Sequence, residues 1–139
     1  VQSEAFVCVC ADCHRFAVRP SIRLAELAVE DFVHGSSTDW QHFYDFLIPL
    51  CRRAGFTPRV VQEAFNTAGI FGLVSCGMGV TVLTENVCGG LPPGLVMIPI
   101  EDVSERLTTT AIWRHDHMAG PTRHFVEYIR DLPVPGSFV

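Results

Sequence analysis

The stretch from Ala54 to Leu83, AGFTPRVVQEAFNTAGIFGLVSCGMGVTVL, predicts a strand, a helix and a second strand in close succession. Residues 58–65, PRVVQEAF, indicate the first strand. Asn66 is a residue type that caps helices, and the run 67–76 is apolar on nearly every side, as in a buried helix. A Gly-Met-Gly turn ends that helix, and residues 80–83, VTVL, predict a buried strand.

The same alternation of strands and helices continues on both sides of this stretch. Before it, the sequence predicts strands at 6–10 and 31–34, a helical turn at 22–27 and a helix ending at Arg53; after it come strands at 95–100 and 107–114 and an amphipathic helix at 121–132. Strands that alternate with helices are typical of α/β proteins with a mainly parallel sheet. We therefore predict an α/β fold with such a sheet.

The composition limits the classes of function. The chain has 139 residues, 48% of them hydrophobic, with a formal net charge of -5, which is typical of a globular protein. All basic residues are arginines and they are scattered along the chain, so we expect no nucleic-acid-binding surface on this segment. No apolar run approaches the length of a membrane span. The six cysteines are not spaced like a small disulfide scaffold, which favours a reducing, cytoplasmic location.

Residues 10–14, CADCH, form a C-x-x-C-H motif, which is the attachment signature of c-type haem. A zinc site would need a fourth ligand beside Cys10, Cys13 and His14, and the sequence has no second C-x-x-C. We therefore expect structural thiols on a strand and in the turn after it, with no cofactor and no metal. Haem binding and redox-sensitive metal binding are the alternatives.

The order of the motifs resembles one family. EAFVCVCADCHRFA, IRLAELAVEDFV, LCRRAGFTPRVVQEA, GLVSCGMGVTVL, LPPGLVMIPI and LTTTAIWR, followed by a closing helix, are similar to the second half of the effector-binding domain of LysR-type transcriptional regulators. The resemblance runs in one register from Glu4 to Leu132. It is most specific where AGFTPRVVQEA is followed by LVSCGMGV.

The resemblance implies a fold like that of type 2 periplasmic binding proteins. Two Rossmann-like lobes are joined by two crossing strands, and the ligand binds in the cleft between them. Residues 1–97 are then the second lobe, and residues 98–139 are the returning strand and helix of an incomplete first lobe. The rest of that lobe, and a helix-turn-helix that binds DNA, are expected upstream of Val1. The protein is expected to be a homodimer or higher homo-oligomer, with another copy covering the edge at 107–114.

The resemblance also implies an effector site at the loop after the predicted strand 31–34 and at the start of the next helices. The residues are His34, Ser36, Ser37, Trp40, Gln41, Phe43, Asn66 and Thr67. Hydroxyl groups and backbone N–H groups before a helix suit an anion, and Trp40 and Phe43 offer apolar walls for a planar ligand. These features suggest an aromatic or short-chain carboxylate. Helix capping by Ser37, Thr38, Asp39 or Asn66, and core packing of Phe43, are the competing explanations.

No set of residues forms a catalytic group. Ser75 lacks the preceding glycine of a nucleophile elbow, because Leu73 occupies that position. The sequence therefore predicts a sensory domain and not an enzyme. A periplasmic solute-binding or haem protein is the first alternative, and an α/β enzyme that uses a cysteine or a His–Asp pair is the second.

Overall fold

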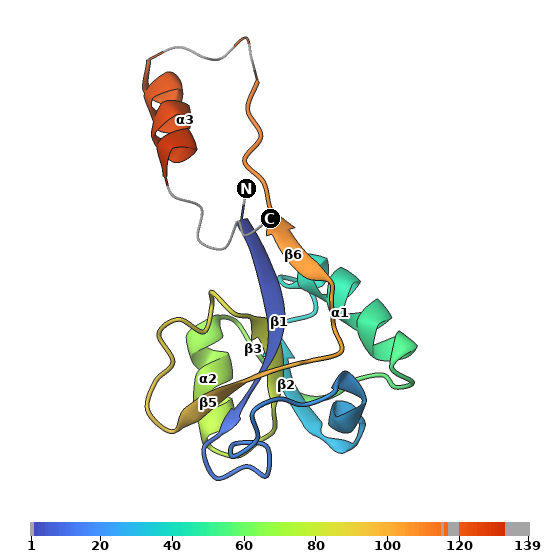
Figure 1. Cartoon of the computed structure of the whole chain (residues 1–139). Coiled ribbons are helices and arrows are strands. Elements are labelled where there is room, and N and C mark those ends of the chain that lie inside the picture. Colours follow the sequence, from blue (N-terminus) through green and yellow to red (C-terminus); the bar gives the residue numbers. More distant parts are fainter. Residues whose placement is uncertain (1, 115, 117–119, 133–139) are drawn as a thin grey trace. The chain divides into compact units, whose positions relative to one another are not determined.

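The computed structural model describes residues 2–114, 116 and 120–132. They fall into two compact units: Glu4–Leu107 is the larger, and Val1–Ser3 together with Thr108–Val139 is the smaller. The elements of both units are labelled in Figure 1.

The larger unit is built around the long strand β1 (Gln2–Ala11). Strand β4 (Thr81–Thr84) pairs antiparallel with β1, with Phe6 opposite Thr84. Strand β5 (Leu95–Pro99) pairs antiparallel with β1 as well, with Val7 opposite Pro99. Strand β6 (Arg106–Thr109) also pairs with β1. A single strand therefore pairs with all three other strands of this four-stranded sheet.

A second sheet has two strands, and they are parallel. Strand β2 (Asp31–Gly35) runs parallel to β3 (Arg59–Ala64), and a parallel bridge joins Phe32 to Val80 just before β4. Val33 donates to the carbonyl of Val80 at 2.9 Å, and Val80 donates to Asp31 at 2.8 Å. A Cβ at Gly79 would overlap the Asp31 carbonyl, so this close approach requires glycine. The Phe32–Val80 bridge links this pair to the four-stranded sheet, in which β1 lies between β4 and β5 and also pairs with β6.

The α/β class is thus confirmed, but the sheet is mixed and not mainly parallel. Strands β3, β2 and β4 run parallel, whereas β1 runs antiparallel to both β4 and β5. Hydrophobic alternation identifies a strand and its two faces but carries no information about its direction. The sequence pattern could therefore predict β1 but not its orientation.

Each face of the sheet has its own hydrophobic core. One core combines Phe6, Cys8 and Cys10 of β1 with helix α1 (Gln41–Arg53) and the 3-10 helix Leu24–Val29. The other combines Val7 and Val9 with helix α2 (Thr67–Ser75). Successive side chains of β1 therefore enter opposite cores, and the strand predicted at 6–10 is confirmed.

The smaller unit contains helix α3 (Pro121–Asp131), as predicted, with proline in its first turn. Within this unit the Arg130 guanidinium lies 5.4 Å from the centre of the Trp113 ring. The strand predicted at 107–114 is only partly present, because β6 ends at Thr109 and residues 110–114 have no regular structure. Among the described residues, no helix is long and apolar enough to span a bilayer.

Candidate functional site

His34, near the end of β2, lies at the centre of an aromatic cluster. Its ring centre is 5.6 Å from that of Trp40, 5.2 Å from Phe43 and 4.7 Å from Tyr44. These four residues are called the aromatic cluster below. His34 is fully buried, and burial lowers its pKa to about 4, so the imidazole is neutral near pH 7. Its Nδ1 accepts from the Gly35 N–H at 2.8 Å, and within the described part of the chain its Nε2 has no hydrogen-bond partner.

Gly35 leaves room for the Trp40 ring in the aromatic cluster. The Trp40 indole lies against its Cα so tightly that a Cβ there would overlap the ring. The Tyr44 hydroxyl donates to the Gly35 carbonyl at 3.0 Å, and burial raises the pKa of that hydroxyl to about 12. Neither Gly35 nor Tyr44 was predicted as a site residue. Helical spacing could have indicated Tyr44, because it follows Trp40 by four residues and lies on the same face of the helix.

Ser36 organises the loop between β2 and α1. Its hydroxyl donates to an Asp39 carboxylate oxygen at 2.8 Å and accepts from the Asp39 N–H at 3.2 Å. The prediction that Ser37, Thr38 or Asp39 caps α1 is wrong. Trp40 is the N-cap residue and makes no side-chain cap, because an indole has no hydrogen-bond acceptor. The Asp39 carboxylate accepts from the Ser36 hydroxyl instead.

Gln41 and Phe43, in the first turn of α1, point to different environments. Gln41 is exposed, and its amide donates to Asp45 at 2.8 Å. Phe43 is half-buried and packs edge-on against Phe6, with ring centres 5.8 Å apart, as well as against His34. Phe43 therefore belongs to the core and to the aromatic cluster at once.

Asn66 and Thr67 follow β3 at the same edge of the sheet. The Asn66 side chain accepts from the Gly69 N–H at 2.8 Å and caps α2, as the sequence predicts. Ser36 donates from its backbone to the Ala64 carbonyl at 3.1 Å. This bond holds the two predicted segments side by side beyond the carboxyl ends of the parallel strands β2 and β3, where open α/β sheets bind ligands.

The cysteines of the CADCH motif lie in contrasting environments. Cys10 is fully buried in the core, and burial raises its pKa to about 11, whereas Cys13 is exposed. His14 contacts Glu30 through Nε2 at 3.2 Å and accepts the Phe16 N–H at Nδ1. Within the described residues, no group of three or more His, Cys, Asp or Glu side chains is placed to hold a metal ion. Cys8 and Cys10 are buried strand thiols, as predicted.

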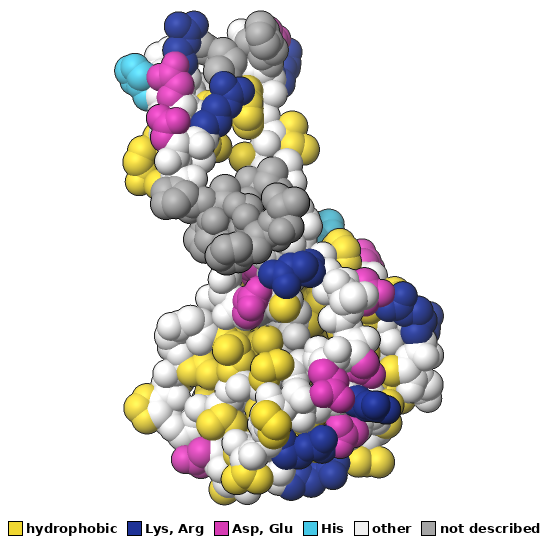
Figure 2. All heavy atoms as spheres, viewed as in Figure 1, with side chains coloured by type: hydrophobic (Ala, Val, Ile, Leu, Met, Phe, Trp, Pro, Cys, Tyr) yellow, Lys and Arg dark blue, Asp and Glu magenta, His cyan; other side chains and the backbone are white. Residues whose placement is uncertain are grey.

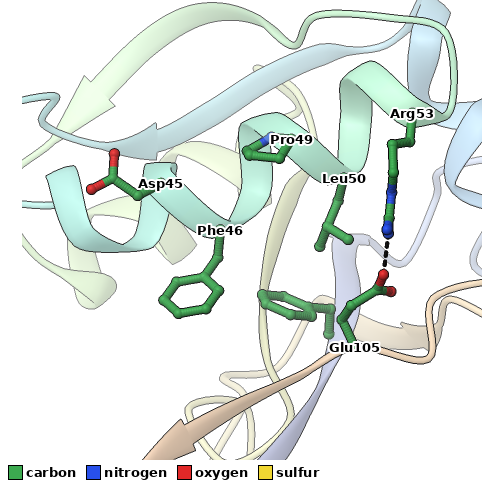
Figure 3. A pocket seen from close by; sticks show the side chains of 7 residues that line it. Asp45, Phe46, Pro49, Leu50, Arg53 and Glu105 are labelled. Carbon is green, nitrogen blue, oxygen red and sulfur yellow. Dashed lines mark hydrogen bonds and ion pairs between the residues drawn. The ribbon is translucent and has the colours of Figure 1, made fainter.

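A separate hollow lies beneath α1 (Figure 3). Its volume is about 220 Å³, and the residues that line it are Phe6, Asp45, Phe46, Pro49, Leu50, Arg53 and Glu105. Figure 3 shows Phe46 and Leu50 pointing from the helix toward the hollow, with an ion pair between Arg53 and Glu105 at one end. We call this feature the α1 hollow. No part of it was predicted from the sequence.

The arginines of the larger unit are mostly neutralised by neighbouring carboxylates. On the face shown in Figure 2, basic and acidic side chains lie next to one another. The ion pairs are Arg15–Glu30, Arg19–Glu26, Arg23–Glu101, Arg53–Glu105, Arg59–Asp31 and Arg106–Glu85. These pairs reduce the net positive charge on this part of the surface.

Comparison with known proteins identifies the family. Residues 1–133 match the family described as LysR substrate binding domain, and the chain belongs to it. A relative in Escherichia coli (strain K12), the uncharacterized HTH-type transcriptional regulator YnfL, is 32% identical over 108 residues. That match covers 78% of this chain and 36% of the relative, so the chain spans little more than a third of that protein's length. The predicted family is confirmed.

Solved structures give the same fold. The LysR family regulator CbnR superposes with a TM-score of 0.79 at 18% identity, over 94% of this chain and 45% of that one. The effector binding domain of QuiR in complex with shikimate superposes with a TM-score of 0.61 at 18% identity, over 76% of this chain and 49% of that one. The predicted periplasmic-binding-protein-like fold is confirmed. The match to the LysR substrate binding domain family favours a ligand-sensing regulatory domain over a periplasmic solute-binding or haem protein.

Proposed function

We propose that the aromatic cluster and the loop beside it form one wall of the effector site of a transcriptional regulator. The predicted contact residues are His34, Ser36, Ser37, Trp40, Gln41, Phe43, Asn66 and Thr67. The observation that carries the proposal is the position of the cluster. It adjoins a hydroxyl-bearing loop, and both lie beyond the carboxyl ends of β2 and β3. Residues 1–97 are proposed as the second lobe, and 98–139 as part of the first.

We propose a small carboxylate with a planar or short apolar body as the effector. Trp40 and Phe43 supply apolar surface, and the exposed Ser37 supplies a hydroxyl next to it. The internal bonds of Ser36 hold the loop in one shape before a ligand arrives. The complex of QuiR with shikimate supports a small-molecule effector in this family.

The proposed mechanism is a shift in population between lobe arrangements. An effector with greater affinity for one arrangement raises the population of that arrangement. In the intact protein, this change would alter how a homo-oligomer presents its DNA-binding helices. We propose that this occurs in the cytoplasm, where such a regulator reaches its DNA.

The test uses the intact protein and a panel of small carboxylates that includes benzoate and shikimate. We expect at least one to raise the melting temperature and to change transcription from the target promoter. Replacing both Ser36 and Ser37 by Ala should raise the concentration needed for half-maximal response about tenfold. The Ser37 hydroxyl can then no longer donate to the carboxylate, and the bonds between Ser36 and Asp39 no longer hold the loop in shape. Thr38→Ala, in the same loop, is the matched control. An unchanged response in the double variant would contradict the proposal.

A further inference from the structure

The larger unit has another cavity, at the opposite end of β2 from the proposed effector site. Asp31 lines this cavity and begins β2, whereas the proposed effector site lies beyond Gly35, where β2 ends. Its walls also include the turn after β1 and the turn between α2 and β4, with Cys13, Arg15 and Met78 among the lining residues. We call it the turn cavity. Its volume is about 470 Å³, against about 220 Å³ for the α1 hollow, and small-molecule sites span about 300–1,000 Å³.

One thiol of the C-x-x-C motif opens into the turn cavity. Cys13 lines the cavity and is exposed, whereas Cys10 is buried in the core. The His14 N–H donates to the Ala11 carbonyl at 3.0 Å, which closes the turn that carries Cys13. Cys76 is exposed as well, but Cys13 is the one thiol among the described residues that line the cavity. A ligand in the cavity therefore lies next to a nucleophile.

A fixed guanidinium lies two residues after this thiol. Arg15 donates to one Glu30 oxygen through Nε at 2.9 Å and through Nη2 at 2.6 Å. Its Cζ also lies 4.4 Å from the centre of the Phe16 ring. These contacts use two of the five N–H donors of a guanidinium, and the Arg15 side chain is 57% exposed. Arg15 can therefore bind a carboxylate at little cost in side-chain entropy.

The charges at the turn cavity have both signs. Arg15 pairs with Glu30, and Asp31 pairs with Arg59. Between these pairs, the Met78 side chain is 43% exposed and offers an apolar, polarisable surface. A ligand with both carboxylate and ammonium groups can match each sign, whereas a ligand with one sign of charge meets repulsion. The cavity therefore suits a small zwitterion with a short apolar or sulfur-containing middle.

We propose that the turn cavity binds a small zwitterionic disulfide of glutathione-like chemistry, and that Cys13 forms a mixed disulfide with it. Cys13 loses its proton to water, and its thiolate attacks one sulfur of the ligand. A bond forms between that sulfur and Cys13 Sγ, and the ligand's own S–S bond breaks. The second sulfur leaves as a thiolate, which takes up a proton. The ligand is the only oxidant, and an excess of the small thiol reverses the exchange.

The test compares two disulfides on the intact protein: oxidised glutathione, and the uncharged bis(2-hydroxyethyl) disulfide. Peptide mass mapping of quenched samples measures the rate of mixed-disulfide formation at Cys13 and at Cys76. We expect the ratio of the Cys13 rate to the Cys76 rate to be about tenfold higher with oxidised glutathione, because its carboxylate gains a charge-assisted bond at Arg15. Equal ratios for the two reagents would overturn the proposal.

Variants of two arginines separate binding from structure. Arg15→Gln should lower the Cys13-to-Cys76 ratio about tenfold with oxidised glutathione and leave it unchanged with the uncharged disulfide. Arg19→Gln is the matched control, because Arg19 is paired with Glu26 and does not line the cavity, and it should retain the ratio. An equal loss with both reagents in Arg15→Gln would show a structural role only and would overturn the proposal. None of these rates depends on the transcriptional response, so the proposed effector site is tested separately.

Discussion

The Trp40 indole packs directly on the Cα of Gly35, in a space that no side chain at position 35 could share. Gly35 is the last residue of β2, and Trp40 is the residue before α1. The contact closes the loop between these elements and brings the indole edge-on to His34, with ring centres 5.6 Å apart. Because glycine has no side chain, Gly35 thus allows Trp40 to take its place in the proposed effector site.

Gly35→Ala should therefore displace Trp40 and open the aromatic cluster. We expect a loss of about 1–3 kcal/mol in the free energy of unfolding, the usual cost of overpacking a closed site. Denaturant unfolding of the two proteins measures this loss, and tryptophan fluorescence should shift because the indole environment changes.

Gly72→Ala is the matched control for this substitution. Gly72 lies inside α2, and a Cβ there would have no neighbour within 4 Å. Alanine in a helix interior should stabilise the protein by about 0.5–1 kcal/mol relative to glycine. Equal stability of Gly35→Ala and the unsubstituted protein would show that the loop can rearrange freely.

The sequence predicts those parts of the fold that depend on neighbouring residues in the chain. Strand β2, helix α2 and the Asn66 cap follow from local patterns and are present. The direction of β1 depends on its pairing with β4, which is distant in the chain. The missing cap at Asp39 depends on the geometry of the loop, in which the Ser36 hydroxyl donates to the Asp39 carboxylate. Local patterns do not encode these.

Burial of neutral His34 should make stability depend on pH. The pKa of His34 falls from its usual 6.5 to about 4 on folding, so the unfolded chain binds more protons between these values. Stability is therefore complete above about pH 6.5 and falls as the pH drops toward 4. Between pH 7.5 and 5, we expect a loss of about 2 kcal/mol from this group.

His34→Phe should remove this part of the pH dependence while keeping a ring in the cluster. His42→Gln, on the exposed first turn of α1, should retain it. Denaturant midpoints measured from pH 5 to 7.5 distinguish the variants. The same slope in His34→Phe and the unsubstituted protein would assign the pH dependence to other groups.

The site itself was only partly predictable. The resemblance led to the loop 36–43, and the structure joins that loop to the end of β3 through Ser36 and Ala64. Tyr44 and Gly35 were missed because their roles depend on a tertiary contact with each other. The α1 hollow combines Phe6, α1 and Glu105, which are distant in sequence, so no local motif could indicate it.

The thiols should separate into two classes of reactivity. Cys13 and Cys76 are exposed, whereas Cys8, Cys10, Cys51 and Cys88 are buried. Burial raises the pKa of Cys51 to about 12 and that of Cys88 to about 11, which leaves little thiolate at neutral pH. We expect iodoacetamide to label two thiols in the native protein and six after unfolding in guanidinium.

The Cys13→Ser variant with a second Cys76→Ser substitution should then resist labelling in the native state. Peptide mass mapping identifies the labelled positions. Rapid native labelling of Cys10 would contradict the buried strand position and would restore the C-x-x-C pair as a candidate reactive site.

Asn66 allows capping and effector contact to be separated. Its side chain accepts from the Gly69 N–H at 2.8 Å at the start of α2, so Asn66→Ala should cost about 1 kcal/mol of stability. Asn66→Asp keeps the accepting oxygen and should unfold at nearly the same denaturant concentration.

If Asn66 only caps the helix, both the stability and the effector response of Asn66→Asp match those of the unsubstituted protein. If it also contacts a carboxylate effector, the added negative charge should weaken binding several-fold with stability unchanged. Calorimetric titration of both variants with the carboxylate that activates the protein decides between these outcomes, and an equally strong response in Asn66→Asp would remove Asn66 from the proposed contact set.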